Sequence, residues 1–114
     1  DYKKQMFSEI HRQLPNAKLV VMSGLLLPGR SEYRELTEEI NKALETLCAE
    51  TDYLWFVDAS AMTWDGQHYA EELFIKDGIH LNHEGQLLWM RDYIRPMIEA
   101  LVAEFDLTQV QKED

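Results

Sequence analysis

The chain has 114 residues, of which 46% are hydrophobic, a proportion that supports one small folded domain and argues against disorder. Twenty-one acidic residues against eleven basic ones give a net charge of −10, without the Lys and Arg clusters that bind nucleic acid. No apolar run approaches the roughly 20 residues of a membrane-spanning helix, so we expect no membrane span. The single cysteine, Cys48, excludes an intrachain disulfide. The compartment stays open, since a chain that begins with Asp1 gives no information on a targeting segment.

The first helix is indicated by apolar residues at every fourth position, which are Tyr2, Met6, Ile10 and Leu14. Pro15-Asn16 ends this helix, and a nearly continuous apolar run then extends from Lys18 to Leu27. Such a run is typical of a strand that is buried on both faces in a parallel sheet covered by helices. Pro28-Gly29 ends the strand.

A second helix and a second strand follow. Ser31 is expected to cap the helix at its N-terminus. The face of this helix that we expect to be buried consists of Tyr33, Leu36, Ile40, Leu44, Leu47 and Cys48. The second buried strand runs from about Tyr53 to Ala59. Strand, helix and strand in this order predict an α/β protein with a right-handed crossover between parallel strands.

The last third of the chain predicts a long loop and a terminal helix. The periodicity weakens from Ser60 to Gly78, and a loop of this length in a compact domain usually has a function. Asn82 is the expected N-cap of the last helix, in which Pro96 should produce a kink or a division into two helices. The apolar positions of this helix are Leu87, Leu88, Ile94, Ile98, Leu101, Val102 and Phe105. We assign residues 1–107 to one domain and 108–114 to a polar tail that should fray.

Two strands are too few for a sheet that is stable alone, because the open edges would expose unpaired backbone groups. Both predicted strands also have the composition of strands buried on two faces. We therefore expect further strands from an N-terminal half that this sequence lacks, or from another chain.

Asp77 and His80 form the strongest candidate for chemistry. They are three residues apart, so a single turn brings both side chains to one side. The carboxylate can then accept a hydrogen bond from one imidazole nitrogen, which fixes the tautomer and leaves the other nitrogen basic. A histidine held in this way is a general base for a hydroxyl nucleophile. The spacing alone is weak support, since it is also found in turns with a surface histidine.

Metal binding is the sharper alternative for this segment. Four possible ligands fall within eight residues, namely Asp77, His80, His83 and Glu84. The two histidines are three residues apart, whereas zinc sites on helices prefer a spacing of four and a further ligand elsewhere. We therefore assign neither a metal site nor a cofactor, and we expect His83 to be a surface residue.

Other candidates have simpler expected roles. His68, after the turn signal Asp65-Gly66, should be exposed, and His11 should be solvated on the polar face of the first helix. Trp64 in the loop is the best tryptophan for contact with a substrate, while Trp55 and Trp89 should be core residues. Asp58 is expected to bond to nearby backbone.

The stretch from Glu72 to Gly85, followed by Leu88-Trp89, resembles the C-terminal signature of GDSL-type esterases, also called SGNH hydrolases. Those enzymes carry Asp-x-x-His-Leu and then Asn and Gly at the start of a terminal helix. Lys18 to Gly24 resembles their fourth strand, and Phe56-Val57-Asp58 resembles the strand before their catalytic loop. The resemblance implies a three-layer α/β/α, flavodoxin-like fold with a parallel sheet, of which this chain would be the C-terminal part without the N-terminal strands.

By the same resemblance, His80 would be the general base and Asp77 its orienting carboxylate in the hydrolysis of acyl esters through a serine acyl-enzyme, without a cofactor. The Gly-Asp-Ser motif of the nucleophile and the Gly-x-Asn-Asp motif of the oxyanion hole are absent. Ser23 and Ser60 fall near strand ends, but neither lies in the strand-to-helix elbow that this chemistry favours.

We therefore expect the isolated chain to lack esterase activity and to need its N-terminal half or a second copy as partner. The acyl-ester substrate stays open. The alternative is a non-catalytic truncated module that associates with itself through the edge of its sheet.

Overall fold

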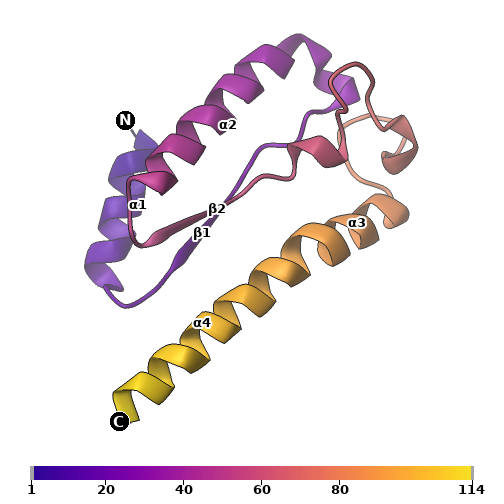
Figure 1. The fold of residues 1–114 in the computed structure, drawn as a ribbon. Helices are drawn as coiled ribbons and strands as arrows, with labels where there is room; N and C mark the ends of the chain where they lie inside the picture. Colours follow the sequence, from indigo (N-terminus) through magenta and orange to yellow (C-terminus); the bar gives the residue numbers. More distant parts are fainter. Residues whose placement is uncertain (1, 114) are drawn as a thin grey trace.

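The computed structural model describes residues 2–113, and it describes side chains for residues 2–104 (Figure 1). The regular elements in chain order are α1 (Tyr2–Gln13), β1 (Leu19–Met22), α2 (Arg34–Ala49), β2 (Leu54–Val57), α3 (His83–Trp89) and α4 (Arg95–Glu113). Short 3-10 helices occupy Pro28–Tyr33, Ser60–Met62 and Glu71–Leu73. A π-helical segment, Met90–Ile94, joins α3 to α4. The chain is therefore a mixed α/β protein with a small parallel sheet, as the sequence predicts.

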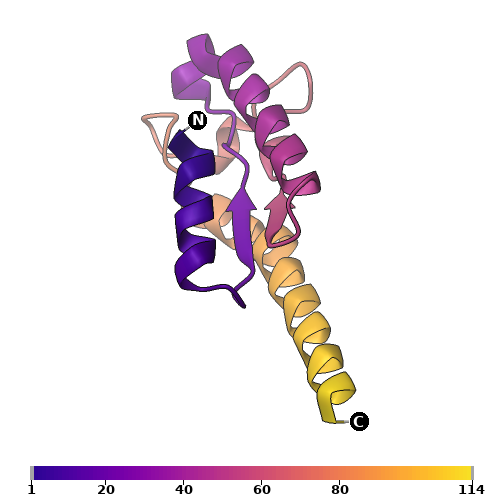
Figure 2. The same ribbon diagram turned by 90° about the vertical axis from the view of Figure 1, so that its left-hand side faces the viewer.

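The sheet consists of β1 and β2, which pair in parallel with Leu19 opposite Leu54 and Met22 opposite Val57. Figures 1 and 2 show α2 on one side of the strands and the rod formed by α3 and α4 on the other. The core beneath α2 joins both strands to α1 and α2 through buried Val21, Leu44, Cys48 and Leu54, with Phe7 and Phe56 packed against them.

The two strands are shorter and less buried than the sequence predicts. Each has four residues, and only Val21 in β1 and Leu54 in β2 are buried, so the expectation of strands covered on both faces is wrong. The chain leaves the sheet after β1 because the buried side-chain amide of Asn41 forms hydrogen bonds with both backbone groups of Gly24. The Gly24 N–H donates to Asn41 Oδ1 at 2.7 Å, and Asn41 Nδ2 donates to the Gly24 carbonyl at 2.9 Å.

One helix cap is confirmed and another is wrong. The Asn82 side chain accepts the Gly85 N–H and caps α3, as expected. Ser31 does not cap α2, since it lies inside the 3-10 helix Pro28–Tyr33 and only its carbonyl accepts the Arg34 N–H. The helix before α2 therefore forms by backbone bonding alone, without a side-chain cap.

The last helix is not broken at Pro96. The chain widens into the π-helical segment just before Pro96, where the Arg95 N–H bonds to the Met90 carbonyl five residues back. The rod in Figure 1 continues through this segment. Helix α4 includes most of the expected polar tail, but the side chains of residues 105–114, Phe105 among them, lie outside the described part, so the boundary at residue 107 stays a prediction.

Much of the apolar surface that the sequence assigns to helix cores is open. The exposed large apolar residues include Tyr2, Met6, Leu14, Tyr33, Leu36, Ile40, Leu87, Ile98 and Val102. The radius of gyration is 16.5 Å. A compact domain of this length would have about 13 Å. The open apolar faces agree with a chain that packs against further polypeptide.

Among the described residues, none of the helices combines the length and the apolar composition of a membrane span.

Candidate functional site

The candidate site is the turn Asp77-Gly78-Ile79-His80, which lies between the 3-10 helix Glu71–Leu73 and α3. Oδ1 of Asp77 accepts the backbone N–H groups of Ile79 at 2.8 Å and His80 at 3.0 Å. Gly78 supplies the left-handed backbone that the turn requires, with φ of 66°. The carboxylate of Asp77 thus holds the turn that carries His80.

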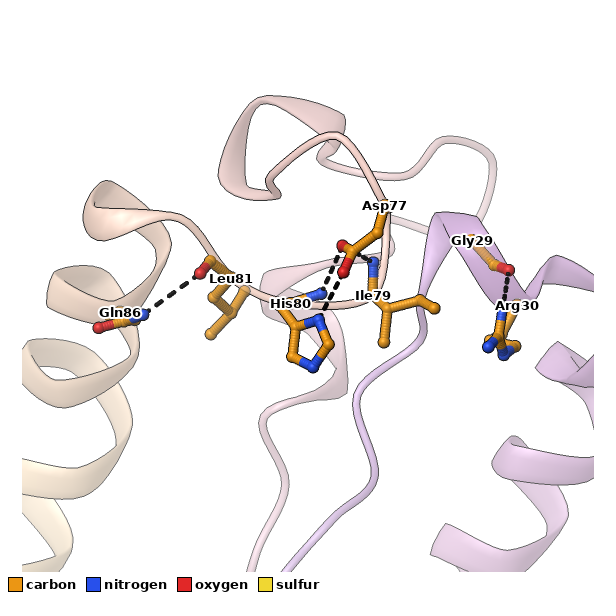
Figure 3. A network of polar contacts seen from close by, with 7 residues as sticks. All are labelled: Gly29, Arg30, Asp77, Ile79, His80, Leu81 and Gln86. Atoms are coloured by element: carbon orange, nitrogen blue, oxygen red, sulfur yellow. Dashed lines mark hydrogen bonds and ion pairs between the residues drawn. The ribbon is translucent and has the colours of Figure 1, made fainter.

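The same carboxylate also holds the imidazole. Nδ1 of His80 lies 2.5 Å from Oδ2 of Asp77, so the two side chains come together as the sequence predicts (Figure 3). The carboxylate accepts, which puts the ring proton on Nδ1 and leaves Nε2 with a free lone pair. His80 is 73% exposed, and its Nε2 has no hydrogen-bond partner among the described residues. The basic nitrogen is therefore open to a molecule from outside.

Asp77 is ionised over the whole physiological range. The backbone N–H of His80, the ring of His80 and the N–H of Ile79 together lower the pKa of Asp77 from 3.8 to about 2. A permanent negative charge beside Nδ1 stabilises the imidazolium that forms when Nε2 takes a proton.

Two glycines fix the turn against the segment that follows β1. The Gly29 N–H donates to the Gly78 carbonyl at 2.8 Å. A Cβ on Gly29 would lie 2.4 Å from the Asp77 carbonyl oxygen, and a Cβ on Gly78 would lie 2.8 Å from the Gly29 nitrogen. Only glycine fits at either position. In the sequence, Pro28-Gly29 indicates only the end of a strand, and no local pattern marks its contact with Gly78.

Asn82 anchors the other end of the turn. Its side chain accepts the Gly85 N–H at 2.9 Å and donates to the Glu72 carbonyl at 2.8 Å, while its backbone N–H donates to the Leu73 carbonyl at 2.8 Å. Phe74 and Leu81 form an antiparallel bridge across the turn. Leu73 and Phe74 are buried with Met62, so the turn is attached to a second small core.

The serines near the strand ends are engaged elsewhere. Ser23 is buried, and its Oγ accepts the Ala59 N–H at 2.8 Å. The Ser60 hydroxyl donates to Asp58 at 2.6 Å, and the Ser60 backbone N–H donates to the same carboxylate at 2.9 Å, which confirms the expected role of Asp58. Burial raises the pKa of Asp58, but the hydrogen bonds from Ser60 and Ser23 outweigh it, and the pKa falls below its ordinary value. Within residues 2–104, no hydrogen bond joins His80 to a serine.

The tryptophans and His11 are partly buried, and the predicted contact of Trp64 with a substrate stays a prediction. Arg34 lies over the Trp64 ring at 4.5 Å and the Tyr69 ring lies 4.6 Å away, so Trp64 is partly covered by its own chain. Trp89 is half-buried and packs against the core of Met62, Leu73 and Phe74, as predicted, whereas Trp55 is half-buried outside both cores. His11 is not solvated, because its ring stacks on Tyr53 at 3.8 Å and its Nδ1 is buried.

The remaining histidines lie at the surface. His68 is 79% exposed in its turn, as expected. His83 begins α3 and is exposed. Within the described residues, no three His, Cys, Asp or Glu side chains gather closely enough to hold a metal ion, so Asp77, His80, His83 and Glu84 do not form a ligand set.

Comparisons with models of protein families, with curated proteins and with solved structures found no match. An ionised carboxylate on Nδ1 and an open Nε2 can remove a proton from a hydroxyl group that is brought within hydrogen-bond distance. The chain thus presents an imidazole with one open nitrogen and a carboxylate that orients the ring.

Proposed function

We propose that Asp77 and His80 are the acid–base pair of a serine-dependent acyl-ester hydrolase of GDSL type. The proposal includes the C-terminal part of a three-layer, flavodoxin-like fold. It is supported above all by the 2.5 Å contact between His80 Nδ1 and Asp77 Oδ2, with Nε2 left open.

In the proposed reaction, Nε2 of His80 removes the proton from a serine hydroxyl as the serine oxygen attacks the acyl carbon of the ester. Asp77 stabilises the resulting imidazolium. The imidazolium then gives its proton to the departing alcohol, which leaves an acyl-serine. Water, deprotonated by the same nitrogen, then attacks the acyl carbon, and the imidazolium returns the proton to the serine oxygen as the acid is released.

The serine is proposed to come from polypeptide outside these residues. The proposal assigns the nucleophile to none of the four serines of the sequence, which are Ser8, Ser23, Ser31 and Ser60. Within the described residues, each strand of the two-stranded sheet has a partner on one side only, so polypeptide can add on either edge. The open apolar helix faces give the same polypeptide a surface to cover.

Hydrolysis of p-nitrophenyl acetate tests the proposal. The 114-residue chain should be inactive. The coding sequence upstream of Asp1 should encode a strand that ends in Gly-Asp-Ser. The longer protein that includes this strand should be active. In that protein, His80→Ala should reduce kcat by about 10³-fold or more, because the serine loses its base.

His68→Ala is the matched control and should keep kcat within about twofold, since this histidine lies in a similar turn without the close carboxylate. A longer protein whose activity survives His80→Ala would overturn the proposal. Turnover by the 114-residue chain that His80→Ala abolishes would place the nucleophile inside this chain.

A second candidate function is a non-catalytic module that pairs with a second copy through the sheet edge. The two open edges and the radius of gyration of 16.5 Å favour it. Sedimentation velocity discriminates between the hydrolase and the non-catalytic module. A folded, inactive dimer of the chain would support the module. A monomer would exclude it.

A further inference from the structure

Arg30 stands directly beside the contact between the two glycines. Its neighbour Gly29 is held against Gly78 by the 2.8 Å hydrogen bond and by the lack of room for a Cβ. The guanidinium donates from Nη1 to the Gly29 carbonyl at 2.9 Å. In Figure 3 the Arg30 side chain and the His80 ring extend to the same side of the turn, with Ile79 drawn between them. The backbone that fixes the general base therefore also fixes the start of Arg30.

Arg30 differs from the other arginines in its charge partners. The chain has five arginines, and four of them form ion pairs: Arg12 with Glu9, Arg34 with Glu38, Arg91 with Asp92, and Arg95 with Glu99. Arg30 is exposed and pairs with no carboxylate among residues 2–104. In a chain with a net charge of −10, an arginine without a carboxylate stands out. Its guanidinium keeps most of its five donors available.

We propose that Arg30 binds an anionic group of the substrate, so that the enzyme prefers acyl esters that also carry a carboxylate or a phosphate. This inference rests on the proposed function. A guanidinium forms paired, charge-assisted hydrogen bonds with either group. Ile79 gives the hydrocarbon between the anion and the ester an apolar surface.

Binding to the 114-residue chain tests the inference without any need for turnover. The probes are monomethyl succinate, 1-acetylglycerol 3-phosphate and the neutral dimethyl succinate, titrated while NMR records the Arg30 Nε–H and His80 ring signals. Either or both anionic esters should shift these signals, which also identifies the preferred anion. The neutral diester should bind about tenfold or more weakly, the effect of losing one charged hydrogen-bonded contact.

Three variants give the controls. Arg30→Met should reduce binding of the anionic esters to the level of the diester, and Arg30→Lys should restore part of it. Lys76→Met removes the same charge next to Asp77 and should change binding by less than about twofold. Equal binding of all three esters, or equal losses in Arg30→Met and Lys76→Met, would overturn the inference.

The outcomes separate this inference from the proposed hydrolase. If the longer protein cleaves neutral and anionic esters at equal kcat/KM and Arg30→Met changes neither, the inference fails and the hydrolase stands. If the chain binds anionic esters through Arg30 but the longer protein has no activity that depends on His80, the hydrolase fails and a binding site for anionic esters stands.

Discussion

The chain folds the pattern Asp-Gly-x-His twice, at residues 65–68 and at residues 77–80, and among these two turns only the second has a hydrogen bond between ring and carboxylate. In the first turn Oδ1 of the aspartate accepts two backbone N–H groups at 2.8 and 2.6 Å, and in the second at 2.8 and 3.0 Å. Both glycines have positive φ, 102° and 66°. Yet Nδ1 lies 3.9 Å from Oδ2 in the first turn and 2.5 Å in the second.

The difference comes from what surrounds each turn. A Cβ on Gly66 would meet no atom within 4 Å, whereas a Cβ on Gly78 would meet the Gly29 backbone at 2.8 Å. Asp65 is 66% exposed and Asp77 is 36% exposed. The local sequence is thus sufficient to form the backbone turn in both copies. The close pair of His80 and Asp77 is found only where distant segments also contact the turn. The two turns form an internal control, and four predictions use it.

The largest effect is expected from Gly29→Ala, which alters the surroundings of the second turn without changing the turn itself. The added methyl would lie 2.4 Å from the Asp77 carbonyl, so the two segments must separate. We expect a loss of about 3 kcal/mol in the free energy of unfolding, measured with urea. The downfield Nδ1–H proton of His80 should also broaden, as in a turn that is not anchored.

Ser31→Ala, an exposed change two residues away, is the control and should alter stability by less than about 0.5 kcal/mol. If Gly29→Ala keeps both the stability and the Nδ1–H signal, the glycine contact does not explain the difference between the turns.

Gly78→Ala and Gly66→Ala compare the turns directly. Both place a Cβ on a backbone with positive φ, which costs about 1 kcal/mol. Gly78→Ala also has the close approach to Gly29, so we expect a loss of about 2–3 kcal/mol in the free energy of unfolding there, against about 1 kcal/mol at Gly66. Equal losses, measured by urea unfolding, would mean that the close approach of Gly29 to Gly78 adds nothing to the cost at the second turn.

The sequence predicts well what depends on neighbours along the chain. The first helix, the Asn82 cap and the approach of Asp77 to His80 follow from spacings of two to four residues. Each is a local preference of the backbone, so a pattern of residues is sufficient to indicate it.

The sequence predicts poorly what depends on segments far apart. Asn41 ends the first strand early by binding Gly24, seventeen residues away, and nothing in the run from Lys18 to Leu27 indicates this contact. The packing of Gly29 on Gly78 is equally invisible in the sequence. The repeated Asp-Gly-x-His pattern is visible in the sequence, but it does not indicate in which copy the ring forms a hydrogen bond with the carboxylate.

Asn82→Ala tests the second anchor of the second turn, which the first turn lacks. The change removes the α3 cap and the hydrogen bond to the Glu72 carbonyl. We expect a loss of about 1–2 kcal/mol in the free energy of unfolding, the usual range for an N-cap. Asn82→Asp keeps the accepting oxygen and should recover part of the loss. A loss that Asn82→Asp does not reduce at all would exclude capping as its cause.

The smallest effect is expected on the pKa values of Asp77 and Asp65, which ¹³C NMR of the carboxyl groups measures. Hydrogen bonds lower the pKa of Asp77 to about 2, whereas the pKa of Asp65 is lowered to a lesser degree, mainly by backbone N–H groups of His68 and Gln67. His80→Ala should raise the pKa of Asp77 part of the way toward 3.8, because the ring bond is lost while the backbone donors remain. His68→Ala should move the pKa of Asp65 less.

The sign of the pH dependence follows from the same shift. Folding lowers the pKa of Asp77, so its contribution to stability is complete above its ordinary pKa of 3.8 and is lost as the pH falls through about 2. In His80→Ala this contribution should be smaller and its loss should be complete at a higher pH, because the folded pKa then lies closer to 3.8, and in His68→Ala the acid limb should stay in place. Equal displacements of the two carboxyl titrations would mean that the 2.5 Å and 3.9 Å contacts are electrostatically equivalent, and the distinction between the two turns would then disappear.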